Sequence, residues 1–167
     1  MSAVRVDTTT GRLRFGDIDV ACTIGKGGAR PAADKREGDG CTPLGIWPVR
    51  AVLLRPRRLM LRSMPAIPWR WIRDGDGWSD DPDDPAYNRP VRLPGRYSAE
   101  RMARDDAAYD AVVVLGHNDA PPVPGMGSAI FFHIEQGRPT EGCVAVSAAD
   151  MAAILPLLTD GTVFDIR

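Results

Sequence analysis

Glycine and proline interrupt this chain so often that short strands joined by turns and loops are the structure it favours. Seventeen Gly and fifteen Pro occur among its 167 residues. Glycine populates the backbone conformations of tight turns, and proline breaks helices and central strands. We therefore expect a mainly β chain with one or two short helices. Its length suits a single domain over residues 1–167.

Short alternating or apolar segments mark the expected strands. The first three segments predict antiparallel hairpins, and the apolar run AVVVL predicts a buried strand. The expected strands are residues 4–6, 12–15, 18–23, 46–54, 111–115, 129–134, 143–146 and 163–166. Residues 25–45 are rich in glycine, proline and charge and predict a long loop, whereas the thirty-five residues after Arg55 suggest no regular element.

Two short helices are expected, over residues 99–105 and 148–158. Ser98 and Ser147 stand at their starts, where a hydroxyl can accept hydrogen bonds from free backbone N–H groups. The second segment carries an apolar face at helical spacing, and Pro156 should shorten or kink it.

The charge balance and the cysteine spacing narrow the class of protein. The formal net charge is −1, so no basic excess argues for nucleic-acid binding. No segment approaches the roughly 18 apolar residues of a membrane span, and the N-terminal residues lack the pattern of a secretory signal. Cys22, Cys41 and Cys143 show no spacing typical of a disulfide framework or structural zinc. We expect a cytoplasmic protein without metal or cofactor, or a periplasmic one if an export signal was removed; the oligomeric state is open.

His133 and Cys143 are the candidate catalytic pair. Each lies in an expected strand, and adjacent strands could bring them together. A histidine can take the proton of a neighbouring thiol and so produce the nucleophilic thiolate. Gly142 has no Cβ, so a substrate or another backbone segment can approach it closely. The N–H groups of Gly142 and Cys143 could hold an oxyanion. A buried thiol and a hydrogen-bonded histidine are the alternative.

Several segments resemble one enzyme family. TEGCVAV, at residues 140–146, resembles the [S/T]-x-G-C-[VI] signature of the YkuD-type L,D-transpeptidase family, which has a histidine on the preceding strand. GKGGARPAADKREGDGCTPLGIW is similar to that family's KxEGDGxTPxG loop, and GWSDDPDDPAYNRPV and GSAIFFHI match one branch. Together these segments cover most of residues 25–158.

The resemblance implies a YkuD-like β-sandwich or mixed sheet with a cysteine active site. Cys143 would be the nucleophile, His133 its base and acid, and Gly142 with Cys143 the oxyanion donors. The substrate would be a peptidoglycan tetrapeptide stem or muropeptide, cleaved between the third residue, a diamino acid, and the terminal D-alanine. Transfer of the resulting thioester to an amine gives a 3→3 cross-link, and transfer to water gives L,D-carboxypeptidase activity.

Two positions depart from the commoner family pattern. Many members have histidine before the Gly-Cys pair and arginine two residues after the cysteine, where this chain has Glu141 and Ala145. Another cation must then bind the substrate carboxylate if such a contact exists. The candidate cations are Lys35, Arg36, Arg55 and Arg138, each of which could equally be solvated surface charge.

The remaining candidates have ordinary structural explanations as well. His117 and Asn118 could line the cleft or merely form a turn, and Thr140 could bond near His133 or stabilise its loop. The four tryptophans could stack on sugar, although packing is favoured. The acidic cluster Asp80, Asp81, Asp83 and Asp84 lacks the features of a calcium loop and favours a solvated turn. A zinc site of His117, His133 and Cys143 is a further alternative.

We expect a cytoplasmic L,D-carboxypeptidase of YkuD type that acts in muropeptide recycling. This choice of water over an amine rests on the missing export signal, because cross-linking needs access to the wall. An exported L,D-transpeptidase is the first alternative. A non-catalytic module that binds peptidoglycan peptides is the second, motivated by Glu141 and Ala145.

Overall fold

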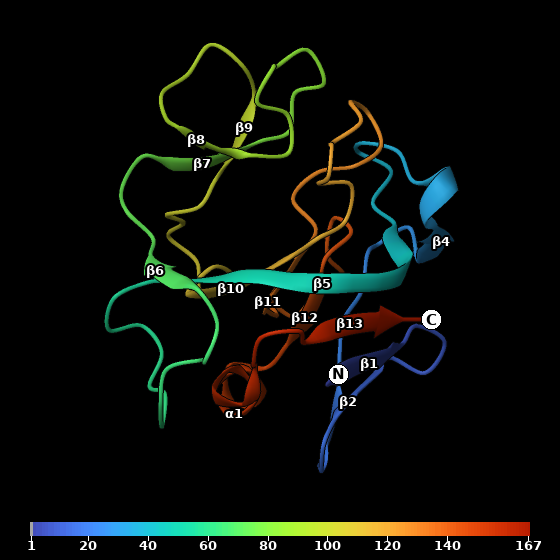
Figure 1. Ribbon diagram of the computed structural model, residues 1–167, viewed down its shortest axis with the longest axis vertical. Coiled ribbons are helices and arrows are strands. Elements are labelled where there is room, and N and C mark those ends of the chain that lie inside the picture. Colours follow the sequence, from blue (N-terminus) through green and yellow to red (C-terminus); the bar gives the residue numbers. More distant parts are fainter. Residues whose placement is uncertain (1) are drawn as a thin grey trace.

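The computed structural model describes residues 2–167, and its main sheet is mixed, with ten strands. Neighbouring strands follow the order β12-β11-β10-β5-β13-β1-β2-β3, and β4 and β6 also pair with β5 (Figure 1). The strands are β1 (Ala3–Asp7), β2 (Arg12–Phe15), β3 (Ile18–Ala21), β4 (Ala29–Pro31), β5 (Thr42–Leu54), β6 (Trp69–Trp71), β10 (Ala111–Leu115), β11 (Phe131–Ile134), β12 (Val144–Val146) and β13 (Val163–Ile166). The expected mainly β fold is confirmed.

Strand β5 joins the two halves of this sheet. It pairs antiparallel with β10 and β13 and parallel with β4 and β6. The hairpins at the start of the chain are antiparallel, as expected, and β13 closes the sheet by pairing parallel with β1. The long loop over residues 25–45 contains β4, a 3₁₀ turn at Ala32–Asp34 and the start of β5.

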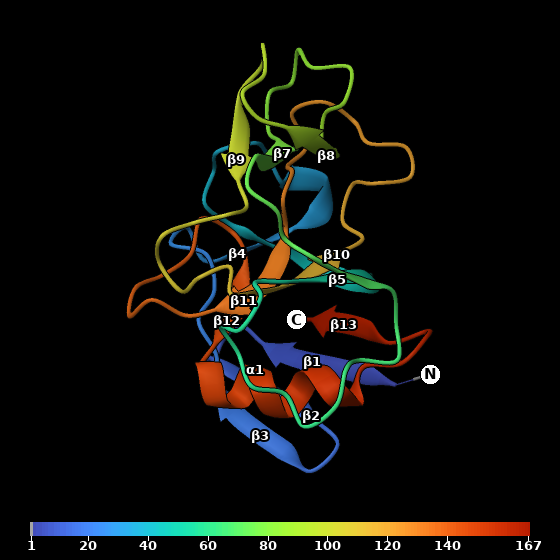
Figure 2. The ribbon, with the colours of Figure 1, turned by 90° about the vertical axis from the view of Figure 1, so that its left-hand side faces the viewer.

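A second sheet corrects two expectations. Strands β7 (Asp76–Ser79), β8 (Pro90–Arg92) and β9 (Ala99–Arg101) form a three-stranded antiparallel sheet at the opposite end of the molecule from the helix (Figures 1 and 2). The expected helix over residues 99–105 is therefore wrong, and so is the expectation of no regular element after Arg55. Such short strands leave no periodic pattern, and pairing with β7 outweighs the weak helical tendency of a seven-residue segment.

The side chain of Asp76 ties this second sheet to the edge strand β6. Its carboxylate accepts hydrogen bonds from Arg70 on β6 at 2.5 Å and from Arg92 on β8 at 2.6 Å. It also accepts one from the backbone N–H of Arg73 at 2.9 Å. These charge-assisted bonds hold a buried carboxylate where three chain segments meet.

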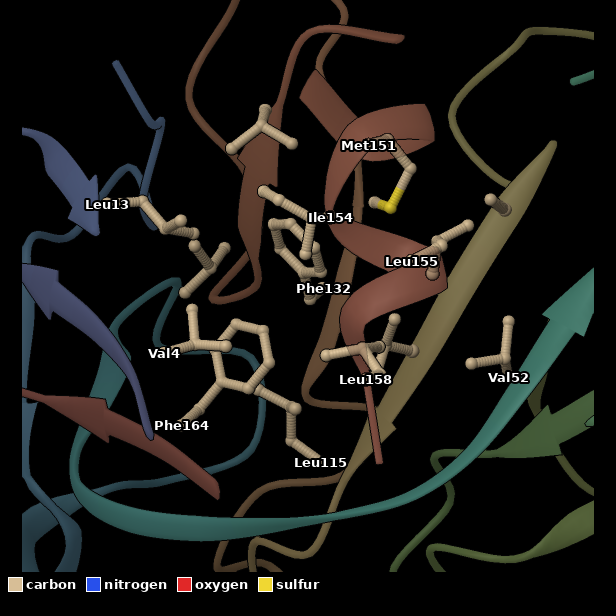
Figure 3. Close-up of a cluster of buried hydrophobic side chains, with 14 of the residues drawn as sticks. Val4, Leu13, Val52, Leu115, Phe132, Met151, Ile154, Leu155, Leu158 and Phe164 are labelled. Atoms are coloured by element: carbon tan, nitrogen blue, oxygen red, sulfur yellow. The ribbon is translucent and has the colours of Figure 1, made fainter. Parts of the chain in front are cut away.

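The helix α1 (Ala148–Ile154) begins as the sequence predicts. The Oγ of Ser147 accepts a hydrogen bond from the Asp150 N–H at 3.1 Å. The helix ends earlier than residue 158, because Pro156 lies in a following 3₁₀ turn, Leu155–Leu157. Met151, Ile154 and Leu155 belong to the main core, and Figure 3 shows Ile154 beside Phe132.

Strands β10, β11 and β12 are buried on both faces. Successive side chains of a strand point to opposite sides, and alternate residues here enter two different cores. Phe132 and Val144 belong to the core beneath α1. Phe131 and Cys143 belong to a second core, which contains Trp78 of β7. The site is therefore placed on the face of the sheet away from α1.

Within residues 2–167, no helix combines the length and the apolar character that crossing a membrane requires.

Truncation of Phe132 tests the main core. Phe132 is fully buried, with its ring centroid 5.0 Å from that of Phe164. Phe132→Ala should lower the free energy of unfolding by about 3–5 kcal/mol in urea denaturation, because it leaves a cavity. Leu157→Ala, at a half-exposed side chain, should change it by about 0.5 kcal/mol or less. Equal losses would contradict this account of the core.

Candidate active site

A cleft of about 660 Å³ opens on the face of the sheet away from α1. Its walls include Cys143, His133, Thr140 and Arg138, four of the residues singled out from the sequence. Segments far apart in the chain build it: the end of β11, the loop into β12, the loop after β4 and the second sheet. The cleft brings the candidate nucleophile and base into one space.

The strand register explains why Cys143 and His133 share this space. In the parallel pair β11–β12, Phe132 lies opposite Val144 and His133 opposite Ala145. Cys143 precedes Val144, so its side chain leaves the sheet on the same face as that of His133. The two side chains therefore stand diagonally across neighbouring strands on the side of the second core.

The thiol of Cys143 is buried and hydrogen-bonded to the backbone. Sγ donates to the carbonyl of Ala129 at 3.3 Å and accepts from the N–H of Phe131 at 3.4 Å. Ala129 has a φ of +52°, an uncommon conformation for a residue with a side chain. No hydrogen bond joins Sγ to His133 within residues 2–167. In the substrate-free site, the proton of the thiol therefore points to the Ala129 carbonyl oxygen. The Cys143 side chain must rotate before this proton can pass to His133.

His133 is held in the form that can accept a proton. Its Nδ1 lies 2.9 Å from the carbonyl oxygen of Ile134, to which it donates a hydrogen bond. Nε2 is then the unprotonated nitrogen, and it has no partner in the described part of the chain. The ring of Tyr109 packs edge-on against the imidazole, with ring centroids 5.4 Å apart. Burial lowers the pKa of His133, which keeps the imidazole neutral.

Burial and a neighbouring carboxylate keep the thiol neutral as well. Burial raises the pKa of Cys143 to about 12, and the charge of Glu100 contributes in the same direction. A neutral thiol beside a neutral imidazole is thus the resting state near pH 7. Proton transfer to His133 must accompany attack on a substrate rather than precede it.

Thr140 organises the backbone around the thiol. Its Oγ1 donates to the carbonyl of Cys143 at 2.6 Å and accepts from the N–H of Gly142 at 3.1 Å. The Gly142 N–H, one of the two expected oxyanion donors, is thereby occupied. The N–H of Cys143 has no acceptor within residues 2–167, so it is the donor that remains for an oxyanion.

Gly142 allows two backbone segments to meet beneath the site. Its φ is +132°, and a Cβ at this position would lie 2.9 Å from the carbonyl oxygen of Cys41. Thr42 adds support from the same loop, since its Oγ1 accepts from the Gly25 N–H at 2.9 Å and donates to the Cys143 carbonyl at 3.4 Å. The loop over residues 25–45 therefore positions the nucleophile.

Three carboxylates line the side of the cleft that the second sheet and the loop after β4 provide. We call Glu37, Asp80 and Glu100 the acidic wall. Glu37 and Glu100 accept hydrogen bonds from the hydroxyls of Tyr87 and Tyr109. Apart from Asp80, these residues were not singled out in the sequence: Glu37 lies in the EGDG loop, but no motif links it to the other two segments.

One of three comparisons with known proteins identifies a family. The family model for the YkuD L,D-transpeptidase catalytic domain matches residues 2–166. The chain belongs to the YkuD family. Comparison with curated proteins and with solved structures finds no match. The family acts by cysteine acyl transfer on peptidoglycan peptides, so the resemblance noted in the sequence is confirmed at the level of the family.

Glu141 and Ala145, the two departures from the commoner YkuD pattern, lie in different environments. Glu141 lies on the rim of the cleft and pairs with Lys26 at 2.7 Å, an exposed ion pair. Ala145 is fully buried, lies opposite His133 and exchanges backbone hydrogen bonds with Thr23. An arginine at position 145 would have no space in this arrangement, so the cation that meets a substrate carboxylate must come from elsewhere.

Arg138 is the candidate cation that the structure brings to the cleft. It is exposed on the rim and has no ion-pair partner within residues 2–167. Lys35 is buried and donates to Asp39 at 2.6 Å. Arg36 and Arg55 donate to backbone carbonyls and do not line the cleft. The geometry favours Arg138 for binding a carboxylate, and the role itself stays a prediction.

His117 and Asn118 do not line the cleft. Nε2 of His117 lies 3.1 Å from the carbonyl of Met126, and its ring packs edge-on against Trp47. The Asn118 amide donates to Val123 and Gly127 carbonyls at 3.0 and 2.9 Å. Both side chains therefore stabilise the turn after β10. Within residues 2–167, no three His, Cys, Asp or Glu side chains gather as a metal site would require.

The tryptophans and the acidic turn also lie largely outside the cleft. Trp78 packs on Phe131 in the second core, whereas Trp69 and Trp71 on β6 are 39% and 45% exposed. Asp81 and Asp84 accept backbone hydrogen bonds within their own turn. Asp80 alone of this acidic cluster enters the cleft wall.

The pKa of the Cys143 thiol predicts its rate of alkylation. Since the pKa is raised to about 12, the thiolate fraction should rise about tenfold per pH unit between pH 6 and 9. Glu100→Gln removes a negative charge near the thiol, so labelling at a given pH should become faster. Iodoacetamide labelling followed by peptide mass spectrometry separates Cys143 from Cys22 and Cys41. A plateau near pH 7 would instead indicate a resting thiolate–imidazolium pair.

Replacement of Thr140 tests its support of the nucleophile. Thr140→Val removes both hydrogen bonds of the hydroxyl, so the Gly142 N–H loses its partner and the Cys143 carbonyl keeps only the longer bond from Thr42; this should cost about 1–3 kcal/mol of unfolding free energy. Thr140→Ser keeps the hydroxyl and should retain most of the stability and the acylation rate. Thermal unfolding and Cys143 acylation report the two effects. Equal stability and equal acylation rates of the two variants would show that the Thr140 hydroxyl does not support the nucleophile.

Proposed function

We propose that this protein is a cysteine-dependent L,D-carboxypeptidase that removes the terminal D-alanine from peptidoglycan tetrapeptide stems. The observation that carries the acyl-transfer chemistry is the placement of Cys143 and His133 on one face of neighbouring strands, in a shared cleft. The family supplies the substrate class. Water as the acyl acceptor is the part of the proposal that goes beyond the family.

The geometry supports a sequence of proton transfers through His133. Nε2 takes the thiol proton while Sγ attacks the carbonyl carbon of the third stem residue. The Cys143 N–H stabilises the oxyanion. The C–N bond then breaks, and His133 returns the proton to the amine of D-alanine. In the second half, His133 takes a proton from water, hydroxide attacks the thioester, and the thiol is restored with release of the tripeptide.

The cations of the cleft support recognition of the departing residue. D-Alanine carries the free carboxylate of the stem, and Arg138 is exposed on the cleft rim without an ionic partner within residues 2–167. An arginine can bind a carboxylate through two parallel hydrogen bonds. We assign Arg138 to this carboxylate.

The acidic wall supports water as the acceptor. An amine attacks a thioester only when it is neutral, and nearby carboxylates favour its protonated form. Glu37, Asp80 and Glu100 would hold an incoming amine as ammonium, whereas water carries no such penalty. The second candidate is an L,D-transpeptidase forming 3→3 cross-links, which the description of the matching family favours.

Product analysis tests the proposal. The protein is incubated with a disaccharide tetrapeptide, with and without an amine acceptor, and the products are followed by mass spectrometry. Tripeptide and free D-alanine are expected in both cases, and dimer would instead establish the transpeptidase. Cys143→Ala should abolish turnover, and His133→Ala should slow acylation about a hundredfold through loss of the general base.

Cys22→Ala is the matched control, because Cys22 lies outside the cleft. It should keep the activity of the unaltered protein. Undiminished activity of Cys143→Ala would overturn the mechanism. Measurable binding of the tetrapeptide without turnover would instead support a non-catalytic binding module.

A further inference from the structure

Residues 55–73 form a basic and partly apolar segment that the proposed reaction does not use. Their sequence, RPRRLMLRSMPAIPWRWIR, contains six arginines and no acidic residue. The formal charge of this segment is therefore +6, in a chain whose net charge is −1. None of these residues, all of which the structure describes, lines the cleft. We call residues 55–73 the basic segment.

Contacts with the main core hold the basic segment in place. Ile67 is buried in that core, and Leu59 and Leu61 pack against it. The Ala66 N–H donates to the carbonyl of Leu158 at 3.1 Å, and β6 pairs with β5. In Figure 1 the segment lies at the left-hand edge of the molecule, and in Figure 2 it crosses the side that faces the viewer, in front of α1. The basic segment is therefore a defined surface on one side of the protein.

This anchoring leaves large apolar side chains in the solvent. Met60 is 88% exposed, although both of its neighbours pack on the core, and Met64 is 38% exposed. Trp69 and Trp71 alternate with Arg70 on β6, so both rings leave the strand on the same face. Their centroids lie 5.2 Å apart. Such a group of exposed apolar side chains is typical of a surface that another molecule covers.

The charge of the basic segment is only partly neutralised by the rest of the protein. Arg70 donates to Asp76 at 2.5 Å. Arg58 lies 4.0 Å from Asp110, and Arg55 donates to a backbone carbonyl. The remaining arginines are exposed and have no ion pair or side-chain hydrogen bond within residues 2–167: Arg57, Arg62 and Arg73. These unpaired cations favour an anionic partner.

We propose that the basic segment binds the surface of a membrane that contains anionic lipids. Negatively charged head groups attract arginines, and methionine and tryptophan side chains can enter the boundary between head groups and acyl chains. The segment presents both kinds of side chain on one side of the protein. Binding there does not occupy the cleft of Cys143, so the site stays free for substrate.

The apolar side chains favour a membrane over a nucleic acid. Phosphate groups of a nucleic acid would also pair with the arginines, but they would leave Met60 without an apolar partner. The rings of Trp69 and Trp71 meet at 76°, so they do not offer parallel faces on which successive bases could stack. A lipid surface meets the charge and covers the apolar side chains together.

Vesicle sedimentation tests the proposal. The unaltered protein is mixed with vesicles of phosphatidylcholine alone and with vesicles that also contain phosphatidylglycerol. Partitioning should be about tenfold or more stronger with the anionic vesicles, and added salt should weaken it through screening. Tryptophan emission should shift to shorter wavelength as Trp69 and Trp71 leave water. Failure to sediment with the anionic vesicles at low salt would overturn the proposal.

Two double variants locate the binding surface. Arg57→Gln/Arg62→Gln should weaken partitioning into the anionic vesicles about tenfold or more, because it removes two unpaired cations. Arg5→Gln/Arg101→Gln is the matched control, since it makes the same change of net charge at exposed arginines of β1 and β9. The control should stay within about twofold of the unaltered protein. Equal weakening by both double variants would show attraction by net charge alone and overturn the assignment to the basic segment.

Met60→Gln separates a membrane from a soluble polyanion. It keeps the charge and the approximate size of the side chain, and it should weaken partitioning into the anionic vesicles about threefold or more. The temperature of thermal unfolding should stay the same, because the Met60 side chain is almost fully exposed. Unchanged partitioning of Met60→Gln, or tight binding of single-stranded DNA by a protein that ignores the vesicles, would overturn the membrane as the partner.

Discussion

Burial of strands β10, β11 and β12 on both faces is the constraint on which the site depends. Each strand sends alternate side chains into the core beneath α1 and into the second core beneath the three-stranded sheet. A shift of β12 by one residue would exchange the two faces and bury Cys143 under the helix. The packing of Phe132 and Val144 on one side thus holds Cys143 and His133 on the other.

The same burial sets the chemistry of the resting site. The thiol keeps its proton because it lies in an apolar core near Glu100, and His133 stays neutral because it is buried and bonded through Nδ1. A neutral pair is inert toward most electrophiles until a substrate changes its surroundings.

The sequence predicted the nucleophile, the base and most of the strands, because each carries a local signal. TEGC surrounds Cys143, and apolar alternation marks β11 and β12. No local signal predicted that Glu37, Asp80 and Glu100 share one cleft wall, since they come from three separate segments that meet only in the folded protein. The helix expected at residues 99–105 is wrong because residues 99–101 pair as a strand with β7, which is distant in the sequence.

The amino-acid sequence by itself determined the mainly β class, the family and the candidate catalytic pair, all of which depend on residue types at fixed spacing along the chain. Only the tertiary structure decided that Gly142 donates to Thr140, that Arg138 rather than Lys35 reaches the cleft, and that carboxylates face the thiol. Hydrogen bonds and ion pairs act over a few ångströms, and the residues that they join here are far apart in the chain.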